Sequence, residues 1–155
     1  MVLRDAAFRC RLKRLALDLL VCAFSQVADA EFLGLMRLGC LNVHFSMLPQ
    51  HRGREPLFYA MLAGRGAGVS VHWMTAGVDS GPVVRQEPLD TLNRNTLHRV
   101  ILSACNLAAR VVPAAIVKAV DHPPKELEAI APLPMADWPS PKEVGRFKDT
   151  GARII

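Results

Sequence analysis

The chain has 155 residues, of which 51% are hydrophobic and 21% are charged, and its formal net charge is +5. This length favours one domain, and the apolar content suffices for a buried core and excludes a disordered chain. The positive charge permits contact with phosphates or an acidic partner but does not require nucleic acid.

Much of the positive charge gathers near the start of the chain, in Arg4, Arg9, Arg11, Lys13 and Arg14. Such a cluster most often forms the solvated face of a helix. No aromatic stacking platform or recognised nucleic-acid motif accompanies it, so nucleic-acid binding is only a minor alternative.

The four cysteines, Cys10, Cys22, Cys40 and Cys105, show no Cys-x-x-Cys spacing. Three of them lie in segments with a buried pattern, which argues against a zinc site or a disulfide framework. We therefore expect no metal site and a reducing, cytoplasmic setting. A small buried thiol is the favoured role for Cys40, ahead of a nucleophile.

Residues 1–30 imitate a targeting signal. Basic residues precede an apolar run, and Ala28-Asp29-Ala30 resembles a signal-peptidase site. Asp18 interrupts the run, however, so we predict folded structure: a helix over residues 6–16, a strand over 17–24 and a helix near 30–33. No run reaches the ~20 apolar residues of a membrane span, so we expect no membrane partner.

A strand with alternating side chains is predicted over residues 39–44. Leu41 and Val43 share one face, and Cys40, Asn42 and His44 share the other. The amide and the imidazole are either satisfied polar groups at a strand end or a site at the carboxyl end of a sheet strand, where open α/β folds bind ligands.

A helix is predicted to begin near Glu55, because Pro56 suits a first turn, and to end at Gly64. We expect its buried stripe to consist of Leu57, Met61 and Leu62.

A second alternating strand is predicted over residues 69–74, with His72 as a structurally satisfied polar group. Asp79 follows in a loop between Gly77 and Gly81, whose backbones permit close approach to a ligand. Residues 82–87 are predicted to form an edge strand.

A long helix is predicted over residues 96–120, capped near Asn95 and kinked or divided at Pro113. Its apolar stripe is Leu97, Val100, Ile101, Ala104, Leu107 and Val111. Prolines recur after Asp121, so we expect an extended tail on the surface with a short helix over 141–148. The predicted division is a core of residues 1–121 and a tail of residues 122–155.

Two stretches together resemble one family. The first contains Asn42, His44, Ser46, Leu48, Pro49, Arg52 and Gly53, and the second contains Gly68, Val69, Val71, His72, Gly77, Asp79, Ser80 and Gly81. This order resembles the folate-dependent formyltransferases, whose Asn-x-His precedes a Ser-x-Leu-Pro-x-x-(Arg/Lys)-Gly-like loop. A Gly-Val-(Thr/Ser)-Val-His-like strand and a Gly-(Val/Leu/Ile)-Asp-(Thr/Ser)-Gly loop follow. The resemblance covers residues 12–120.

The resemblance implies an α/β fold: the C-terminal half of a formyltransferase-type Rossmann-like sheet, with flanking helices and a Pro-rich tail. It implies a cis peptide bond between Leu48 and Pro49. The N-terminal βα units usual in the family have no counterpart before residue 12, so we expect an upstream segment, a partner chain or an oligomer to complete the sheet.

The resemblance also implies the chemistry: transfer of a formyl group from 10-formyltetrahydrofolate, a co-substrate, to an amine. Asn42, His44 and Asp79 match the catalytic residues of the family. An amide N–H donor can stabilise the oxyanion, and an imidazole can donate to it when protonated. Asp79 would favour the imidazolium and assist proton transfer.

Two loops correspond to the folate-binding segments of the family. They contain Phe24, Ser25, Gln26 and Val27 in the first loop and Thr75, Ala76, Gly77 and Val78 in the second. The other expected partner is a small amine-bearing substrate. The residues after Asp121 are too few for the C-terminal β-barrel of initiator-tRNA enzymes.

Two alternatives stay open at this point. One is a non-catalytic binding or scaffold remnant of the fold, and the other is hydrolysis of formyl-tetrahydrofolate. Retention of Asn42, His44 and Asp79 favours the enzyme, and the absent front half favours the remnant.

Overall fold

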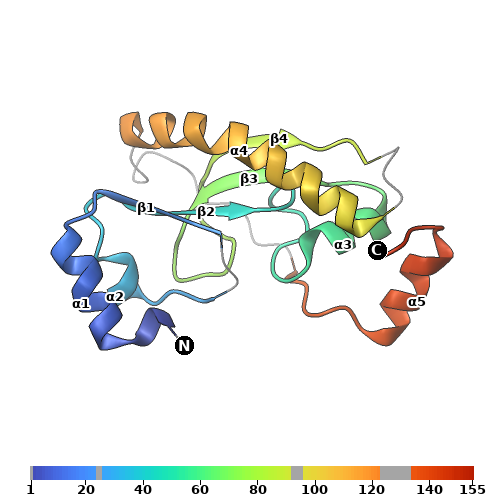
Figure 1. The fold of residues 1–155 in the computed structure, drawn as a ribbon, viewed down its shortest axis with the longest axis horizontal. Coiled ribbons are helices and arrows are strands. Elements are labelled where there is room, and N and C mark those ends of the chain that lie inside the picture. Colours follow the sequence, from blue (N-terminus) through green and yellow to red (C-terminus); the bar gives the residue numbers. More distant parts are fainter. Residues whose placement is uncertain (1, 24–25, 92–95, 123–133) are drawn as a thin grey trace.

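A computed structural model of the protein describes residues 2–23, 26–91, 96–122 and 134–155. Within them, one mixed sheet has the strand order β1-β2-β3-β4. Its strands are β1 (Leu19–Cys22), β2 (Gly39–His44), β3 (Gly68–Trp73) and β4 (Val83–Pro88). β1 and β2 run parallel, whereas β2–β3 and β3–β4 are antiparallel pairs. This sheet with flanking helices is the predicted α/β fold, and β4 is the predicted edge strand (Figure 1).

The N-terminal segment that imitates a targeting signal is folded. A 3-10 turn, η1 (Val2–Arg4), leads into helix α1 (Ala6–Leu15), and α2 (Ala30–Leu33) follows β1. Asp29 caps α2 by accepting from the backbone N–H of Phe32. The Arg9 guanidinium binds the Asp29 carboxylate at 2.6 Å and also pairs with Glu31, which fastens α1 to α2.

The two faces of β2 separate as the alternation predicts. Leu41 and Val43 enter the main core, and Cys40 packs in a smaller core with Phe32 and Met36. Every residue of β3 is buried, because helices and loops cover both of its faces. Polar groups on this strand therefore need partners inside the protein.

Helix α3 (Pro56–Ala63) begins and ends where the sequence predicts, with Gly64 as a left-handed C-cap. The predicted buried stripe was wrong in part. The buried side chains are Leu57, Phe58 and Ala60, while Met61 and Leu62 are only half-buried. Helix α5 (Pro141–Asp149) causes this difference, because its Phe147 stacks on Phe58 with ring centroids 4.6 Å apart.

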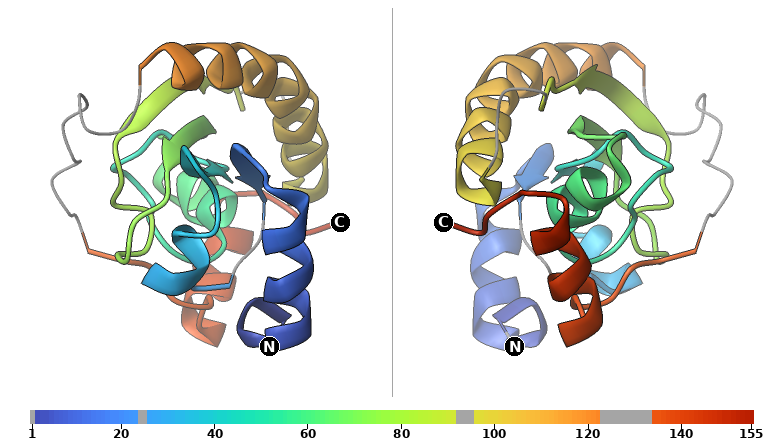
Figure 2. Two further views of the ribbon diagram at one scale, coloured as in Figure 1. Left: turned by 90° about the vertical axis from the view of Figure 1, so that its left-hand side faces the viewer. Right: turned by 90° about the vertical axis from the view of Figure 1, so that its right-hand side faces the viewer.

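Helix α4 (Leu97–Asp121) continues through Pro113 as one helix that bends over the sheet (Figure 2). Its N-cap is Thr96, whose side chain accepts from the backbone N–H of Arg99. The predicted cap, Asn95, lies outside the described residues. Ile101 is exposed by 37%, so its place in the buried stripe was wrong; Ala115 and Ala119 extend the stripe instead.

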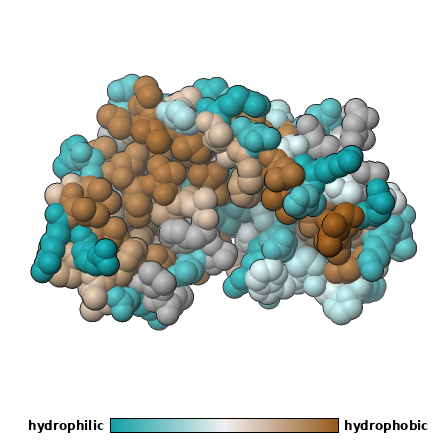
Figure 3. Space-filling model, in the orientation of Figure 1, coloured by the Kyte–Doolittle hydropathy of each residue, from teal (hydrophilic) through white to brown (hydrophobic). Residues whose placement is uncertain are grey.

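The outer side of α4 is apolar and uncovered by the described residues. Leu102, Val117 and Val120 are each more than half exposed. Figure 3 shows the apolar area continuing from the C-terminal half of α4 toward β1, which is an edge strand of the sheet. By length and composition alone, α4 is long and apolar enough to cross a membrane. This is weak support for a span, because core helices pass the same test and α4 packs on β3 and β4.

The tail of the chain joins the core. The predicted helix over 141–148 is α5, with Ser140 and Glu143 forming a capping box. Beyond α5, the Arg153 carbonyl accepts from the backbone N–H of Leu97 at 2.7 Å. Phe147 of the tail also belongs to the main hydrophobic core, and the division at residue 121 stays a prediction.

Candidate active site

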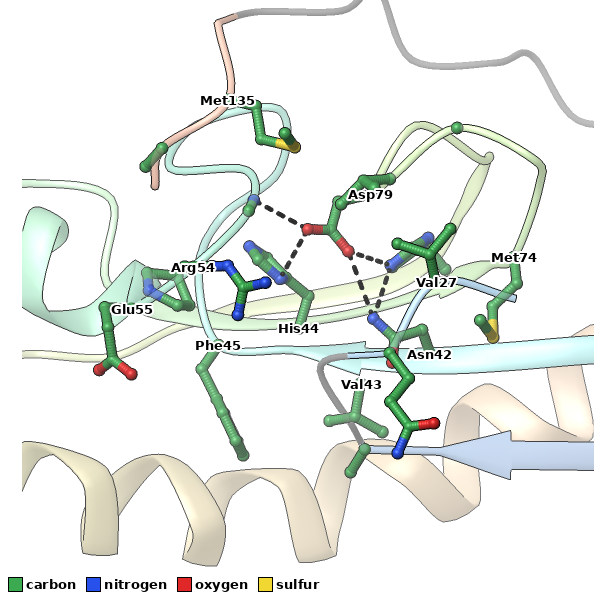
Figure 4. Close-up of a pocket in the computed structure, with 18 of the residues that line it drawn as sticks. Val27, Asn42, Val43, His44, Phe45, Arg54, Glu55, Met74, Asp79 and Met135 are labelled. Atoms are coloured by element: carbon green, nitrogen blue, oxygen red, sulfur yellow. Dashed lines mark hydrogen bonds and ion pairs between the residues drawn. The ribbon is translucent and has the colours of Figure 1, made fainter. Parts of the chain in front are cut away.

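Asp79 stands at the centre of a buried polar cluster at the carboxyl end of β2. Its Oδ1 lies 3.4 Å from the Asn42 amide nitrogen and 3.5 Å from His72 Nε2. Its Oδ2 lies 3.4 Å from His44 Nδ1 and accepts from the backbone N–H of Gly53 at 2.9 Å. The three residues that the sequence singled out thus converge, as Figure 4 shows.

The turn after β2 is fixed by side-chain hydrogen bonds. Ser70 of β3 donates its hydroxyl to the Ser46 carbonyl and accepts from the backbone N–H of Leu48 at 3.1 Å. The Leu48-Pro49 peptide bond is cis, as the resemblance implies. This turn directs the chain back so that Gly53 reaches the Asp79 carboxylate.

Arg52 holds the loop that carries Asp79. It is 7% exposed, and its guanidinium donates from Nε to the Val78 carbonyl at 3.2 Å and also from Nη2. Asp79 itself has φ 45, a left-handed conformation that is uncommon outside glycine. Such a backbone persists only where its surroundings fix it, and here Arg52 and Gly53 do so.

Burial sets the protonation state of His44. Desolvation lowers the pKa of His44 below its ordinary value of 6.5, and the opposing charge of Asp79 does not restore it. The resting imidazole is therefore neutral, although the charge of Asp79 acts in the expected direction and favours the imidazolium. Its Nε2 lies 3.0 Å from the His51 carbonyl, which can only accept, so Nε2 carries the hydrogen.

The Asp79 carboxyl is ionised. Its burial acts to raise the pKa, but the neighbouring His72 and His44 imidazoles and the Gly53 N–H together lower it below its ordinary value of 3.8. The site thus holds an anion beside a neutral imidazole, with Nδ1 of His44 facing the carboxylate.

His72 belongs to this cluster, although the strand pattern indicated only a satisfied structural group. It is 2% exposed; Nδ1 donates to the Trp73 carbonyl at 2.9 Å, and Nε2 faces the Asn42 amide nitrogen at 3.3 Å. The signal that could have found it is register, since His72 is the partner of Asn42 across β2 and β3. Arg52 and Gly53 belong to the sequence motif, but the motif does not show that Arg52 binds the Val78 carbonyl or that the Gly53 N–H donates to Asp79.

One polar atom of Asn42 has no hydrogen-bond partner among the residues that the structure describes. Its NH2 is directed to Asp79 and His72, whereas its Oδ1 is buried and accepts no hydrogen bond from the described residues. An unsatisfied buried acceptor at a pocket wall favours a ligand that brings its own N–H or O–H.

The cluster forms the wall of a pocket of about 940 Å³. The predicted donor-binding residues that line it are Gln26, Val27, Thr75, Ala76, Gly77 and Val78. Phe24 and Ser25, the other two predicted residues, lie outside the described residues. The lining also includes residues that the sequence did not indicate: Met74, Arg54, Glu55, Ile101, and Met135 to Trp138 of the tail.

Cys40 and the other thiols lie outside this lining. Burial raises the pKa of Cys40 to about 12, which makes it the inert thiol that was expected. Cys22 is also buried, but Cys10 and Cys105 are exposed, so the expectation of three buried cysteines was wrong. Among the described residues, no group of His, Cys, Asp or Glu side chains could hold a metal ion.

Residues 2–116 match the family model described as Formyl transferase. The chain is 31% identical to a methionyl-tRNA formyltransferase of Bacillus licheniformis over 91% of its own length and 49% of that protein. It is 35% identical to the methionyl-tRNA formyltransferase of Bacillus subtilis, covering 78% of this chain and 42% of the relative.

The comparison with solved structures also finds formyltransferases. A glycinamide ribonucleotide transformylase from Symbiobacterium toebii superposes with a TM-score of 0.66 at 32% identity, covering 72% of this chain and 54% of the other. The formyltransferase PseJ from Anoxybacillus kamchatkensis, solved with a formamido sugar nucleotide and tetrahydrofolate, shares the fold at 17% identity, a TM-score of 0.58, and coverage of 85% and 69%. The chain spans about half or less of the length of the relatives that its sequence matches. On the match of residues 2–116 and these relatives, the chain belongs to the formyl transferase family.

Proposed function

We propose that the protein catalyses, in this pocket, the transfer of a formyl group from 10-formyltetrahydrofolate to an amine. The observation that carries the proposal is the convergence of Asn42, His44 and Asp79 on one pocket. The predicted donor segments line the same pocket, and Figure 4 draws Val27 beside the cluster.

The chemistry starts from the negative charge that grows on the formyl oxygen when the amine attacks. An amide N–H aimed at that oxygen stabilises it, and removing one such donor typically costs about 10²–10³-fold in rate. The Asn42 NH2 is directed to Asp79 in this structure, so the proposal requires the amide to turn toward the pocket.

The proton shed by the attacking amine also needs an acceptor. His44 is neutral and sits between the Asp79 carboxylate and the His51 carbonyl. A neutral imidazole satisfies one of these two acceptors, whereas the imidazolium satisfies both. Asp79 therefore stabilises the imidazolium once a proton arrives, either directly from the amine or through water. The imidazolium then returns that proton to N10 of the folate as the bond between N10 and the formyl carbon breaks, so that tetrahydrofolate leaves.

Folate binding is the first test. Titration with 5-formyltetrahydrofolate, a stable analogue of the donor, should raise the melting temperature, because a ligand bound only to the folded state stabilises it. The absence of any shift at millimolar analogue would contradict the proposal and favour the scaffold remnant.

Transfer itself is tested with Asn42→Ala and Asp79→Ala. Each should lower kcat/KM for formyl transfer by about 10²-fold or more while the analogue still binds. Hydrolysis differs from transfer in one readout: it consumes the donor at an undiminished rate when no amine is present.

A further inference from the structure

A short stretch of the tail closes one side of the pocket. Residues 134–138, here called the tail strap, lie against the chain at Gly53 in a parallel bridge to Ala136. The Ala136 N–H donates to the Arg52 carbonyl at 2.8 Å, and the Arg54 N–H donates to the Ala136 carbonyl at 3.0 Å. Tyr59 adds a third link by donating its hydroxyl to the Asp137 carbonyl at 3.1 Å.

The tail strap is anchored to the residues that hold Asp79. Gly53, its bridge partner, donates its N–H to the Asp79 carboxylate. A Cβ at position 53 would collide with the Ala136 carbonyl oxygen, and φ is +94 there, so only glycine permits both contacts. The position of the strap is therefore fixed relative to the polar cluster.

The pocket has two sides. Figure 4 shows Val27 and Met74 on one side of Asn42 and Asp79, and Phe45, Arg54 and Glu55 on the other, with Met135 beside the latter group. The first side carries the segments assigned to the folate donor. A transfer between two bound substrates leaves the strap side for the acceptor.

The strap side offers unusual apolar surface. Met135 is 59% exposed and Trp138 is 61% exposed, although both line the pocket. The Arg54 guanidinium lies 4.9 Å from the centre of the Trp138 ring and 3.5 Å from the Asp137 carboxylate, so the indole is held in place. A fixed, exposed indole suits a flat or ring-shaped group, because stacking buries its face without ordering a flexible side chain.

We propose that the tail strap is the acceptor-binding wall of the pocket and that the acceptor is an amine carried on a ring-bearing body. The inference rests on the proposed formyl transfer. Met135 and Trp138 contact the ring, while Asn42 and the Asp79 cluster face the amine.

The two sides can be tested separately by calorimetric titration of the full chain. Glycinamide ribonucleotide and a UDP-linked 4-amino sugar are the ring-bearing probes, glycinamide is the ringless control, and 5-formyltetrahydrofolate probes the donor side. Trp138→Ala should weaken binding of a ring-bearing probe about tenfold or more and change folate affinity less than about twofold. Trp138→Phe should restore most of the loss, because it retains an aromatic face.

Val27→Ala is the matched variant on the donor side, since Val27 is also exposed at the pocket, by 54%. It should weaken the folate analogue and spare the ring-bearing probes. A second readout is the fluorescence of Trp138, whose emission should shift to shorter wavelength when a bound ring shields the exposed indole from water. The other tryptophan, Trp73, is 2% exposed and provides a constant background.

The outcomes separate this inference from the proposed function. Ring-bearing probes that fail to bind the wild-type chain, or that bind Trp138→Ala equally well, overturn the acceptor assignment. Folate binding in that same experiment leaves formyl transfer standing. Loss of folate affinity in Trp138→Ala equal to the loss of probe affinity would also overturn the assignment, because the strap would then serve the whole pocket.

Discussion

Asp79 gathers two side chains of β2, one of β3 and one backbone N–H around a single carboxylate. Each of these groups is ordinary by itself. Together they keep an anion buried and leave a neutral imidazole beside it, which is the condition that proton transfer near neutral pH requires.

The lowered pKa of His44 makes stability depend on pH. Below pH 6.5 the unfolded chain binds a proton at His44 that the folded chain does not. The free energy of unfolding should therefore be highest above pH 6.5 and fall with acidification by up to about 1.4 kcal/mol per pH unit, until the folded group also titrates. Urea unfolding at a series of pH values measures this slope.

His44→Asn provides the control for that slope, since it removes the titrating group and retains a polar side chain. An unchanged slope between pH 6.5 and 5 in the variant would contradict the assignment. Asp79 acts in a separate, more acid window. Its pKa is lowered, so its contribution is present above pH 3.8 and is lost as the pH falls below that value.

Gly53→Ala should destabilise the protein by about 2–4 kcal/mol, because a left-handed φ and a collision with Ala136 act together. Gly64→Ala is the matched control: Gly64 also has positive φ, +66, but a Cβ there would meet no atom within 4 Å. That variant should cost only about 1 kcal/mol. Equal losses in denaturant unfolding would show that the tail strap contributes nothing.

At the scale of elements, helix α4 has two apolar sides, of which one is buried and the other is exposed. Its inner stripe packs on β3 and β4, and its outer side remains apolar and uncovered by the described residues. Periodicity could not tell these sides apart, because both are rich in Val, Leu and Ala. Ile101 was misassigned for this reason: its spacing fits the stripe, but it faces the pocket.

Two substitutions on α4 separate its sides. Val111 is fully buried, so Val111→Ala should cost about 1.5–3 kcal/mol through lost burial and a cavity. Val117 is 65% exposed, and Val117→Ala should change stability by less than about 0.5 kcal/mol because alanine also has the better helix propensity. Chemical denaturation of both variants checks the pair, and similar losses would mean that α4 is oriented differently.

At the scale of the whole molecule, the tail completes the fold instead of merely wrapping it. Phe147 of α5 has no exposed surface and stacks on Phe58 of α3. The same tail supplies the tail strap beside the candidate active site. The position of the strap and the packing of α5 on α3 therefore depend on the same segment of the chain.

Phe147→Ala should therefore lower the free energy of unfolding by about 3–5 kcal/mol, the usual cost of removing a buried aromatic ring. Ile155→Ala, at a position 93% exposed, should be neutral and serves as the tail control. Thermal unfolding followed by circular dichroism should show one transition for the wild-type chain. A separate early transition for α5 would instead support the predicted boundary at residue 121.

The amino-acid sequence by itself determined the local elements and the identities of the central residues. Alternation placed Asn42 and His44 on one face of β2, the proline and glycine signals bounded α3, and the two-part motif indicated the family. These features are local or consist of fixed spacings, so they can be recognised without coordinates.

Only the tertiary structure decided what surrounds those residues. The partnership of His72 with Asn42 depends on strand register, the neutral state of His44 depends on burial, and the tail strap depends on a contact between Gly53 and Ala136, far apart in sequence. Register, desolvation and long-range contacts arise from the packing of distant segments, and no local pattern of residue types encodes them.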